Sequence, residues 1–257
     1  MTAAADVAAD AAARGRPRLL SYVGRWGRAR RWLPDDAQVV VDVGCAFGYG
    51  TAALRGRSAR RVVGVEPDPD HLREAARRYP QIRVLEGDAT ALPFEDGSAD
   101  AVVMLDVLEH LPDPRAALAE ARRVLRRDGV VVVSVPHRGP LARIDALNLY
   151  PSLQRRFRSW QPVEAADETG PEGHRHFAVS ELQGLLAPHF ALERVARTGL
   201  GLQELVHLGL LVAFKGLVRS RRAYRALLPL HFVTYLADDL VPAGPLGYHL
   251  MVRARAV

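Results

Sequence analysis

The chain has 257 residues, of which 49% are apolar and 25% charged, as is ordinary for a globular protein with a full core. One domain with an elaboration is favoured over two independent domains. The net charge of +6 comes almost entirely from arginine, since Lys215 is the only lysine, and together with the abundant alanine it indicates a coding bias. Nucleic acid is therefore disfavoured as a partner. The single cysteine, Cys45, excludes an internal disulfide and suits a reducing cytoplasm.

The N-terminal segment does not have the pattern of a secretory signal, because acidic residues interrupt it and its arginines come late. We expect residues 1–16 to form a flexible tail and residues 18–33 to form a basic amphipathic helix that ends before Pro34. No stretch reaches the roughly 18 uninterrupted apolar residues of a membrane span. The nearest, residues 199–217, contains several polar side chains.

Strand and helix patterns then alternate along the chain. Apolar runs predict strands at 39–43, 61–66, 82–88, 100–106 and 129–136. Helices are expected between them at 49–56, 67–79 and 114–125, with Asp68 or Asp70 as the cap of the second. Strands that are apolar throughout and separated by helices indicate a parallel sheet covered on both faces, and hence an α/β fold.

The regular alternation ends at Pro136. Residues 137–176 are expected to form a long loop or cap, 179–190 a helix, 191–196 a strand and 202–240 further helix. Residues 247–256 alternate well enough to be a last strand, which we expect at the edge of the sheet. The domain plan is a single domain over 17–257, with its core at 36–137 and cap or substrate elements at 138–180 and 200–242.

The segment VVVDVGCAFGYGT, residues 39–51, is a strand followed by a glycine turn. Its spacing, G-x-A-x-G-x-G from Gly44 to Gly50, is not the G-x-G-x-x-G of a dinucleotide site, and no Gly-Lys-Ser/Thr of a P-loop follows. Asp42, two residues before the first glycine, suits a cation such as an amino group better than a phosphate.

The next two strands also end in acids. Glu66 at the end of the second strand could accept hydrogen bonds from a ribose diol, and it would repel a 2′-phosphate. Asp88 after the third strand could accept from an exocyclic amine. The three acids at successive strand ends predict a site for an adenosine without phosphates. Glu66 could instead cap the next helix, and Asp88 could be a plain turn residue.

Four segments together resemble the successive motifs of class I S-adenosylmethionine-dependent methyltransferases, of the small-molecule type that includes ubiquinone and menaquinone methyltransferases. They are VVVDVGCAFGYGT, VVGVEPD, LEGDATALPFEDGSADAVVMLDVLEHLPDP and LRRDGVVVVSVP, which lie in order over residues 36–137. The resemblance implies a doubly wound, mostly parallel, Rossmann-like sheet of seven strands with an antiparallel last strand and a helical cap. It implies S-adenosyl-L-methionine as the cofactor.

By this resemblance the cofactor-binding residues follow the strand ends in order: Asp42, Gly44, Ala46 and Gly48 at the methionine end, Glu66 at the ribose, Asp88 and Ala89 at the adenine, and Asp106 closing the site. Ala46 departs from the family, which usually has glycine at that position. We expect the departure to be tolerated, since alanine adopts most backbone conformations other than those of positive φ.

Methyl transfer to a hydroxyl also requires removal of a proton, by a base or with help from a metal. Asp106, Glu109 and His110 would share one face of a helix at i, i+3 and i+4. This pattern resembles an element of magnesium-dependent O-methyltransferases that act on quinone precursors and small-RNA ribose, with His174 or His176 in the place of a downstream histidine. The candidate bases are therefore His110, His174 and His176. No metal is expected, because metal-free relatives share the motif; Mg²⁺, if bound, would be held by Asp106, Glu109, His110 and His176.

The apolar segment 202–240 bears on the acceptor. On a helix, Glu204, His207 and Lys215 form one narrow polar stripe. The segment could be a buried cap, a homodimer helix, or a lid over an apolar acceptor. It could also be a helix on a membrane surface, with a basic flank at Arg219, Arg221, Arg222 and Arg225 and a second basic segment at 14–31.

The favoured hypothesis is a methyltransferase of the cytoplasm, or of the inner membrane face as a peripheral protein. Its reaction would be O-methylation of a hydrophobic small molecule, such as a polyketide, glycolipid or quinone-like acceptor, in secondary metabolism or lipid modification. The alternatives are a non-catalytic, membrane-associated protein that binds S-adenosylmethionine, and an RNA methyltransferase. The sequence contains no recognised RNA-binding module, which places the RNA alternative last.

Overall fold

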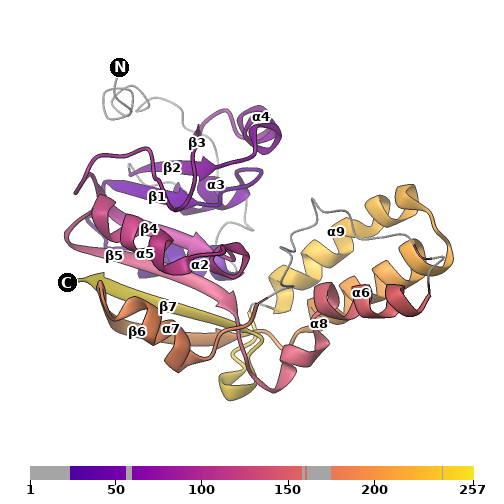
Figure 1. Cartoon of the computed structure of the whole chain (residues 1–257). Coiled ribbons are helices and arrows are strands. Elements are labelled where there is room, and N and C mark those ends of the chain that lie inside the picture. The colour runs from indigo at the N-terminus through magenta and orange to yellow at the C-terminus, as the bar shows by residue number, and fades with distance from the viewer. Residues whose placement is uncertain (1–23, 56–59, 158–159, 161–174, 239) are drawn as a thin grey trace.

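The computed structural model describes residues 24–55, 60–157, 160, 175–238 and 240–257 (Figure 1). The predicted tail 1–16, the start of the predicted basic helix and His174 lie outside these residues. At the centre is a seven-stranded sheet in the order β3-β2-β1-β4-β5-β7-β6. The strands are β1 Val39–Val43, β2 Arg61–Glu66, β3 Arg83–Glu86, β4 Ala99–Leu105, β5 Leu125–Pro136, β6 Phe190–Thr198 and β7 His249–Ala256.

The first five strands are parallel, and β7 pairs antiparallel with both β5 and β6. The predicted class, a mostly parallel α/β sheet with an antiparallel last strand, is confirmed. The prediction that the last strand lies at an edge is wrong. β7 is inserted between β5 and β6, and its run His249–Val252 is buried because it has a partner on each side.

Helices cover both faces of the sheet, as the apolar strands require. Side chains from α5 (Pro114–Val124) and α7 (Val179–Leu186) pack with Val41 and Val102 on one face. Side chains from α2 (Gly24–Trp32) and α3 (Tyr49–Arg55) pack with Val40 and Val103 on the other. The outer helix α4 (Pro69–Arg78) begins at Asp68, whose carboxylate accepts from the amides of Asp70 and His71, so the predicted cap is confirmed.

A helical cap extends from the carboxyl edge of the sheet (Figure 1). It comprises η4 (Pro140–Ile144), α6 (Ala146–Arg156), α8 (Leu202–Leu210), the π-helix η5 (Leu211–Leu217) and α9 (Arg221–Asp238). Residues 137–176, expected as a loop or cap, thus contain helix in their described part. The cap has a small core of its own, made by Ala146, Tyr150, Leu210, Leu211 and Tyr224. No helix within the described ranges is long and apolar enough to cross a membrane.

Candidate functional site

A cavity of about 510 Å³ opens at the carboxyl edge of the sheet, between the strand ends and the cap. Its first half is lined by the glycine turn and by the ends of β2 and β3, and contains Gly44, Ala46, Glu66, Asp88 and Ala89. Its second half is lined by α8 and the start of β7, and contains Gln203, Glu204, His207, Tyr248 and His249. Between the halves lie Arg25, Asp106, Glu109 and His110. Sequence-predicted cofactor residues and a polar wall from the cap therefore share one space.

The glycine turn places bare backbone against the cavity. Gly44 has φ of +71°, and a Cβ there would approach the Val107 side chain to 2.6 Å. Ala46 also has a positive φ, of +43°, and its amide donates to Glu66 Oε2 at 3.0 Å. Our reason for expecting alanine to be tolerated is therefore wrong, because Ala46 occupies the backbone region that alanine avoids. The turn holds it there through the bond to Glu66.

Replacing Ala46 with glycine should stabilise the protein. The left-handed conformation is unfavourable for alanine by roughly 1–2 kcal/mol, and the greater freedom of glycine in the unfolded chain offsets part of this, so we expect a net gain of about 0.5–1 kcal/mol. Urea denaturation of the two proteins measures the difference. Ala52→Gly in α3, where φ is not positive, is the control and should destabilise by a similar amount. A loss of stability in Ala46→Gly would contradict the inference that the backbone at Ala46 is strained.

Asp42 lies beneath the turn rather than on the cavity wall. It is buried, and its Oδ2 accepts from Thr51 Oγ1 at 2.7 Å. Burial, with the nearby Glu66 carboxylate adding to it, raises the pKa of Asp42 to about 7, although the bond from Thr51 opposes the shift. Gly48, also predicted at the methionine end, is not on the wall either: its φ is +78°, and a Cβ there would meet Ile82 and Ala75. Asp42 and Gly48 therefore support the turn on the side that faces away from the cavity.

The raised pKa of Asp42 predicts a pH-dependent stability. A carboxyl that is protonated in the folded protein but ionised in the unfolded chain loses its stabilising contribution as pH rises from about 4 to about 7. Asp42→Asn keeps an acceptor for Thr51 and cannot ionise. We expect it to match the wild type at pH 4 and to be more stable by about 4 kcal/mol at pH 8, since a pKa unit corresponds to about 1.4 kcal/mol. Urea denaturation across this range tests it, with exposed Asp96→Asn as the control; parallel curves for Asp42→Asn and wild type would contradict the prediction.

Glu66 is held in place on several sides. Besides the Ala46 amide, it accepts from the Asp68 amide at 3.3 Å, and His71 Nδ1 lies 3.3 Å from its Oε1. The helix cap is Asp68, so the alternative that Glu66 serves only as a cap is not supported. Asp88 accepts from the amide and hydroxyl of Thr90, which lowers the pKa of its carboxyl. Asp88 is therefore both a turn residue and part of the cavity wall.

Asp106 forms an ion pair with a residue that the sequence reasoning did not single out. Arg25 of α2 is 1% exposed, and its Nη1 contacts Asp106 Oδ1 at 2.5 Å and Ser134 Oγ at 3.2 Å. Ser134 Oγ also donates to Asp106 Oδ1 at 2.8 Å. Asp106 has a φ of +58°, so this carboxylate is fixed in an unusual backbone conformation at the end of β4. The pair joins α2 to the middle of the cavity.

Breaking this pair from its two sides should have unequal effects. Asp106→Asn leaves the charge of Arg25 fully buried, whereas Arg25→Met leaves a carboxylate whose side chain is 30% exposed to water. Removing one partner of a fully buried pair costs roughly 3–5 kcal/mol, and we expect about 2 kcal/mol for Asp106→Asn and less for Arg25→Met. Asparagine tolerates positive φ, so backbone strain does not explain the loss. Denaturation of both variants tests the order, and a larger loss in Arg25→Met would contradict it.

The predicted helical face of Asp106, Glu109 and His110 is not formed. Asp106 precedes a short 3₁₀ turn, η3 (Leu108–His110), and its positive φ excludes it from any helix. All three residues nevertheless line the cavity, and Glu109 is buried. Asp106 forms an ion pair with Arg25. In the described ranges, no group of three or more histidine, cysteine or acidic side chains is arranged to hold a metal ion. The described geometry therefore does not fit the Mg²⁺ set Asp106, Glu109, His110 and His176.

His176 does not reach the cavity wall. Its Nε2 lies 3.2 Å from Oδ2 of the fully buried Asp145, and its ring packs edge-on against Tyr248 with the centroids 5.9 Å apart. Tyr248 does line the cavity. Burial, with the carboxylates of Glu204 and Asp145 nearby, raises the pKa of its phenol. His176 thus supports the wall from behind and is not in position to take a proton from a ligand.

The wall contributed by α8 and β7 was largely missed from the sequence. Gln203 Nε2 lies 3.0 Å from His249 Nε2, Glu204 Oε2 accepts from the Ala146 amide at the start of α6, and His207 Nε2 lies 3.0 Å from the Tyr224 hydroxyl. The polar stripe of Glu204 and His207 was the available signal, and it faces the cavity. Nothing in the pattern of residues 247–256 indicated that His249 would join it.

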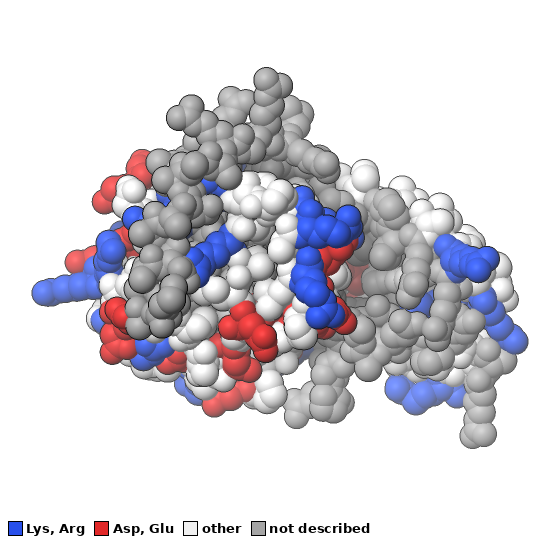
Figure 2. All heavy atoms as spheres, turned by 90° about the horizontal axis from the view of Figure 1, so that it is seen from above, with Lys and Arg blue, Asp and Glu red and all other residues white. Residues whose placement is uncertain are grey.

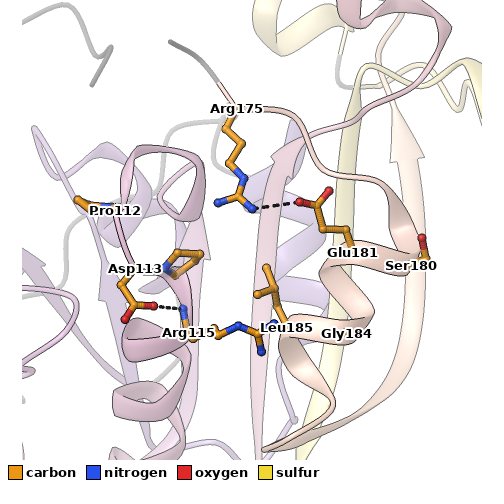
Figure 3. A pocket seen from close by; sticks show the side chains of 9 residues that line it. Pro112, Asp113, Arg115, Arg175, Ser180, Glu181, Gly184 and Leu185 are labelled. Carbon is orange, nitrogen blue, oxygen red and sulfur yellow. Dashed lines mark hydrogen bonds and ion pairs between the residues drawn. The ribbon is translucent and has the colours of Figure 1, made fainter. Parts of the chain in front are cut away.

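A second hollow lies between α5 and α7 (Figure 3). Arg175 contacts Glu181 at 3.0 Å, and the Asp113 carboxylate accepts from the backbone amide of Arg115. None of the sequence-predicted site residues lines it. The site is therefore the cavity at the carboxyl edge.

The fold and this cavity together indicate a class of protein. An α/β sheet with a glycine turn after β1 and carboxylates after β2 and β3 has, at its carboxyl edge, the features expected of a site for an adenosine without phosphates. Residues 41–133 match the family described as "Methyltransferase domain". Over these residues the chain is therefore similar to class I S-adenosylmethionine-dependent methyltransferases, in agreement with the resemblance of its four motifs.

Named relatives match stretches of the chain of similar length. A probable S-adenosylmethionine-dependent methyltransferase of Mycolicibacterium smegmatis is 41% identical over 99 residues, which is 38% of each protein. A demethylmenaquinone methyltransferase of Renibacterium salmoninarum is 39% identical over 130 residues, covering 46% of this chain and 54% of that protein. The chain thus spans about two fifths to half of the length of these relatives.

Solved structures extend the likeness to the whole fold. A SAM-dependent methyltransferase of Thermotoga maritima, described as a possible histamine N-methyltransferase, aligns with a TM-score of 0.58 over 90% of this chain and 86% of its own. Sequence identity is 21%, so the likeness concerns the fold alone.

Proposed function

We propose that the protein transfers a methyl group from S-adenosylmethionine to a hydroxyl of a small molecule with an apolar body. The observation that carries the proposal is the single cavity, in which cofactor-type residues and a polar wall from the cap face one space. The demethylmenaquinone methyltransferase relative is consistent with an acceptor of the quinone type. Polyketide and glycolipid acceptors have the same combination of a hydroxyl and an apolar body.

The residues fit the cofactor. The bare backbone at Gly44 permits a close approach, and Glu66 at the end of β2 presents a carboxylate to the cavity where the family binds ribose. Asp88 and Ala89 would lie at the adenine and Asp106 would close the site. S-adenosylmethionine, when bound, supplies an electrophilic methyl group on a sulfonium. The work left to the chain is to orient the acceptor and to remove its proton.

His249 is the best placed base among the cavity histidines. Its imidazole is buried on a strand paired on both sides, and Gln203 Nε2 lies against its Nε2. With the Gln203 amide oriented as it is here, its nitrogen donates and His249 Nε2 accepts, and the proposal places the ring proton on Nδ1. The lone pair on Nε2 can then take the proton of an acceptor hydroxyl that displaces the amide. His207 is engaged by Tyr224, and His110 lies on a short turn.

The first test is calorimetric titration of the full chain with S-adenosylhomocysteine. We expect saturable binding with one site per chain. Transfer of a labelled methyl group from S-adenosylmethionine to naphthoquinols and substituted phenols then tests the acceptor. No binding of S-adenosylhomocysteine would refute the proposal. Binding with no transfer to any of the hydroxyl compounds would favour a non-catalytic protein instead.

A further inference from the structure

The outer end of the cap exposes apolar side chains. Leu217 and Val218, which follow the buried part of η5, are 70% and 61% exposed, and Phe157 after α6 is 44% exposed. Trp160 stacks on Phe157 with the centroids 4.8 Å apart, and its ring lies against Gly216. These contacts bring the end of α6 and the end of η5 together. We call Phe157, Trp160, Leu217 and Val218 the cap tip.

Arginines flank the cap tip. Arg155 and Arg156 end α6, Arg219 follows Val218, and Arg222 lies in the first turn of α9; all four are exposed. Between Glu204 and Asp238, and between Asp145 and Trp160, the sequence contains no acidic residue. Glu204, Asp238 and Asp145 are themselves buried. Figure 2 shows arginine side chains among uncharged ones on the described part of the cap.

We propose that the cap tip docks on the surface of a bilayer that contains anionic lipids. Exposed Leu and Val with Trp and Phe beside them match the boundary between headgroups and acyl chains, where aromatic rings are favoured. The arginines complement anionic headgroups, and each contributes about a fivefold gain in partition near such a surface. A second copy of the chain is a poorer occupant, because among the described residues of the cap it would bring two sets of arginines together with no exposed acid to pair them.

The geometry also connects the surface to the cavity. α8 continues directly into η5, so one continuous helical segment runs from Gln203 and His207 on the cavity wall to Leu217 at the cap tip. An apolar acceptor dissolved in the bilayer would therefore meet the protein at the end of the segment that lines the cavity. The docking itself does not depend on methyl transfer, and it can be tested without a cofactor or an acceptor.

The test is flotation of the full chain with vesicles of phosphatidylcholine alone or of phosphatidylcholine with phosphatidylglycerol. We expect binding to the anionic vesicles that weakens with added salt, and a blue shift of tryptophan emission that Trp160→Phe abolishes. Arg219→Gln with Arg222→Gln should lower the partition coefficient about 30-fold. Leu217→Gln with Val218→Gln should lower the partition coefficient on both kinds of vesicle.

The matched controls are Arg73→Gln on α4 and Val195→Gln on the edge strand β6, both exposed and distant in the fold, and neither should change binding. A far-ultraviolet circular dichroism spectrum and a urea midpoint equal to those of the wild type would show that the variants are folded. Absence of binding to anionic vesicles, or equal effects of the cap-tip and control variants, would overturn the proposal. So would sedimentation showing a dimer that the cap-tip variants dissociate. None of these results would affect the proposed methyl transfer.

Discussion

Replacing Glu66 with alanine should weaken binding of S-adenosylhomocysteine by about 100-fold in calorimetric titration. A carboxylate that accepts two ribose hydroxyls loses two charge-assisted hydrogen bonds, each worth roughly 1.5 kcal/mol or more. The same change removes the acceptor of the Ala46 amide, which holds the glycine turn in its strained conformation. Both effects act on the cofactor half of the cavity. Glu66→Gln keeps one acceptor oxygen and should lose about tenfold.

Glu86→Ala is the matched control for Glu66. The two residues are register partners at the ends of neighbouring strands, but Glu86 is exposed and does not line the cavity. We expect the affinity of Glu86→Ala for S-adenosylhomocysteine to equal that of the wild type. If Glu86→Ala and Glu66→Ala weaken binding equally, the effect comes from the overall charge of this edge and not from a ribose contact.

Replacing His249 with asparagine should lower the rate of methyl transfer to a hydroxyl acceptor by about 100-fold, the usual contribution of a general base. Affinity for S-adenosylhomocysteine should not change, because His249 lies in the other half of the cavity. Asparagine can still bond to Gln203, so the wall keeps its shape. Single-turnover transfer of a labelled methyl group by the variant and the wild type measures the difference in rate.

Two further histidine variants separate the candidates. His110→Asn removes the cavity histidine that follows Asp106 in the sequence. His176→Asn breaks the buried contact to Asp145. We expect His176→Asn to reduce stability more than rate, since its ring supports Tyr248 from behind. A larger fall in rate for His110→Asn than for His249→Asn would move the base to the end of β4. Labelling of histidine nitrogens gives an independent check, because the proposal requires the Nδ1–H tautomer at His249.

The central sheet could be predicted because local patterns determine it. Apolar runs identified β1 and β2 to the residue, and the sequence narrowed the cap of α4 to Asp68 or Asp70, of which Asp68 is the cap. Glu66, Asp88 and the glycine turn were brought to one edge because parallel strands all end there. These inferences need only the period of the strands and the geometry of a parallel sheet.

The polar wall from α8 and β7 could not be predicted in the same way, because it depends on contacts between distant segments. Arg25 reaches Asp106 across the sheet, and His249 reaches Gln203 only because β7 is inserted between β5 and β6. The alternation of residues 247–256 indicates a strand but not its neighbours. The helical spacing of Asp106, Glu109 and His110 was misleading, since the chain turns through a positive φ at Asp106.

The place of β7 also has a consequence for how the chain folds. β6 is joined to the rest of the sheet only through β7, and β5 has no neighbour on that side until β7 arrives. Contacts between segments so far apart in sequence form slowly, because a long loop must close before they contribute. The five parallel strands can therefore assemble first, leaving the valine-rich flank of β5 open to incorrect strand pairing in the meantime. A partly folded chain would possess the side of its cavity formed by the glycine turn and the ends of β2 and β3 before it had the wall from α8 and β7.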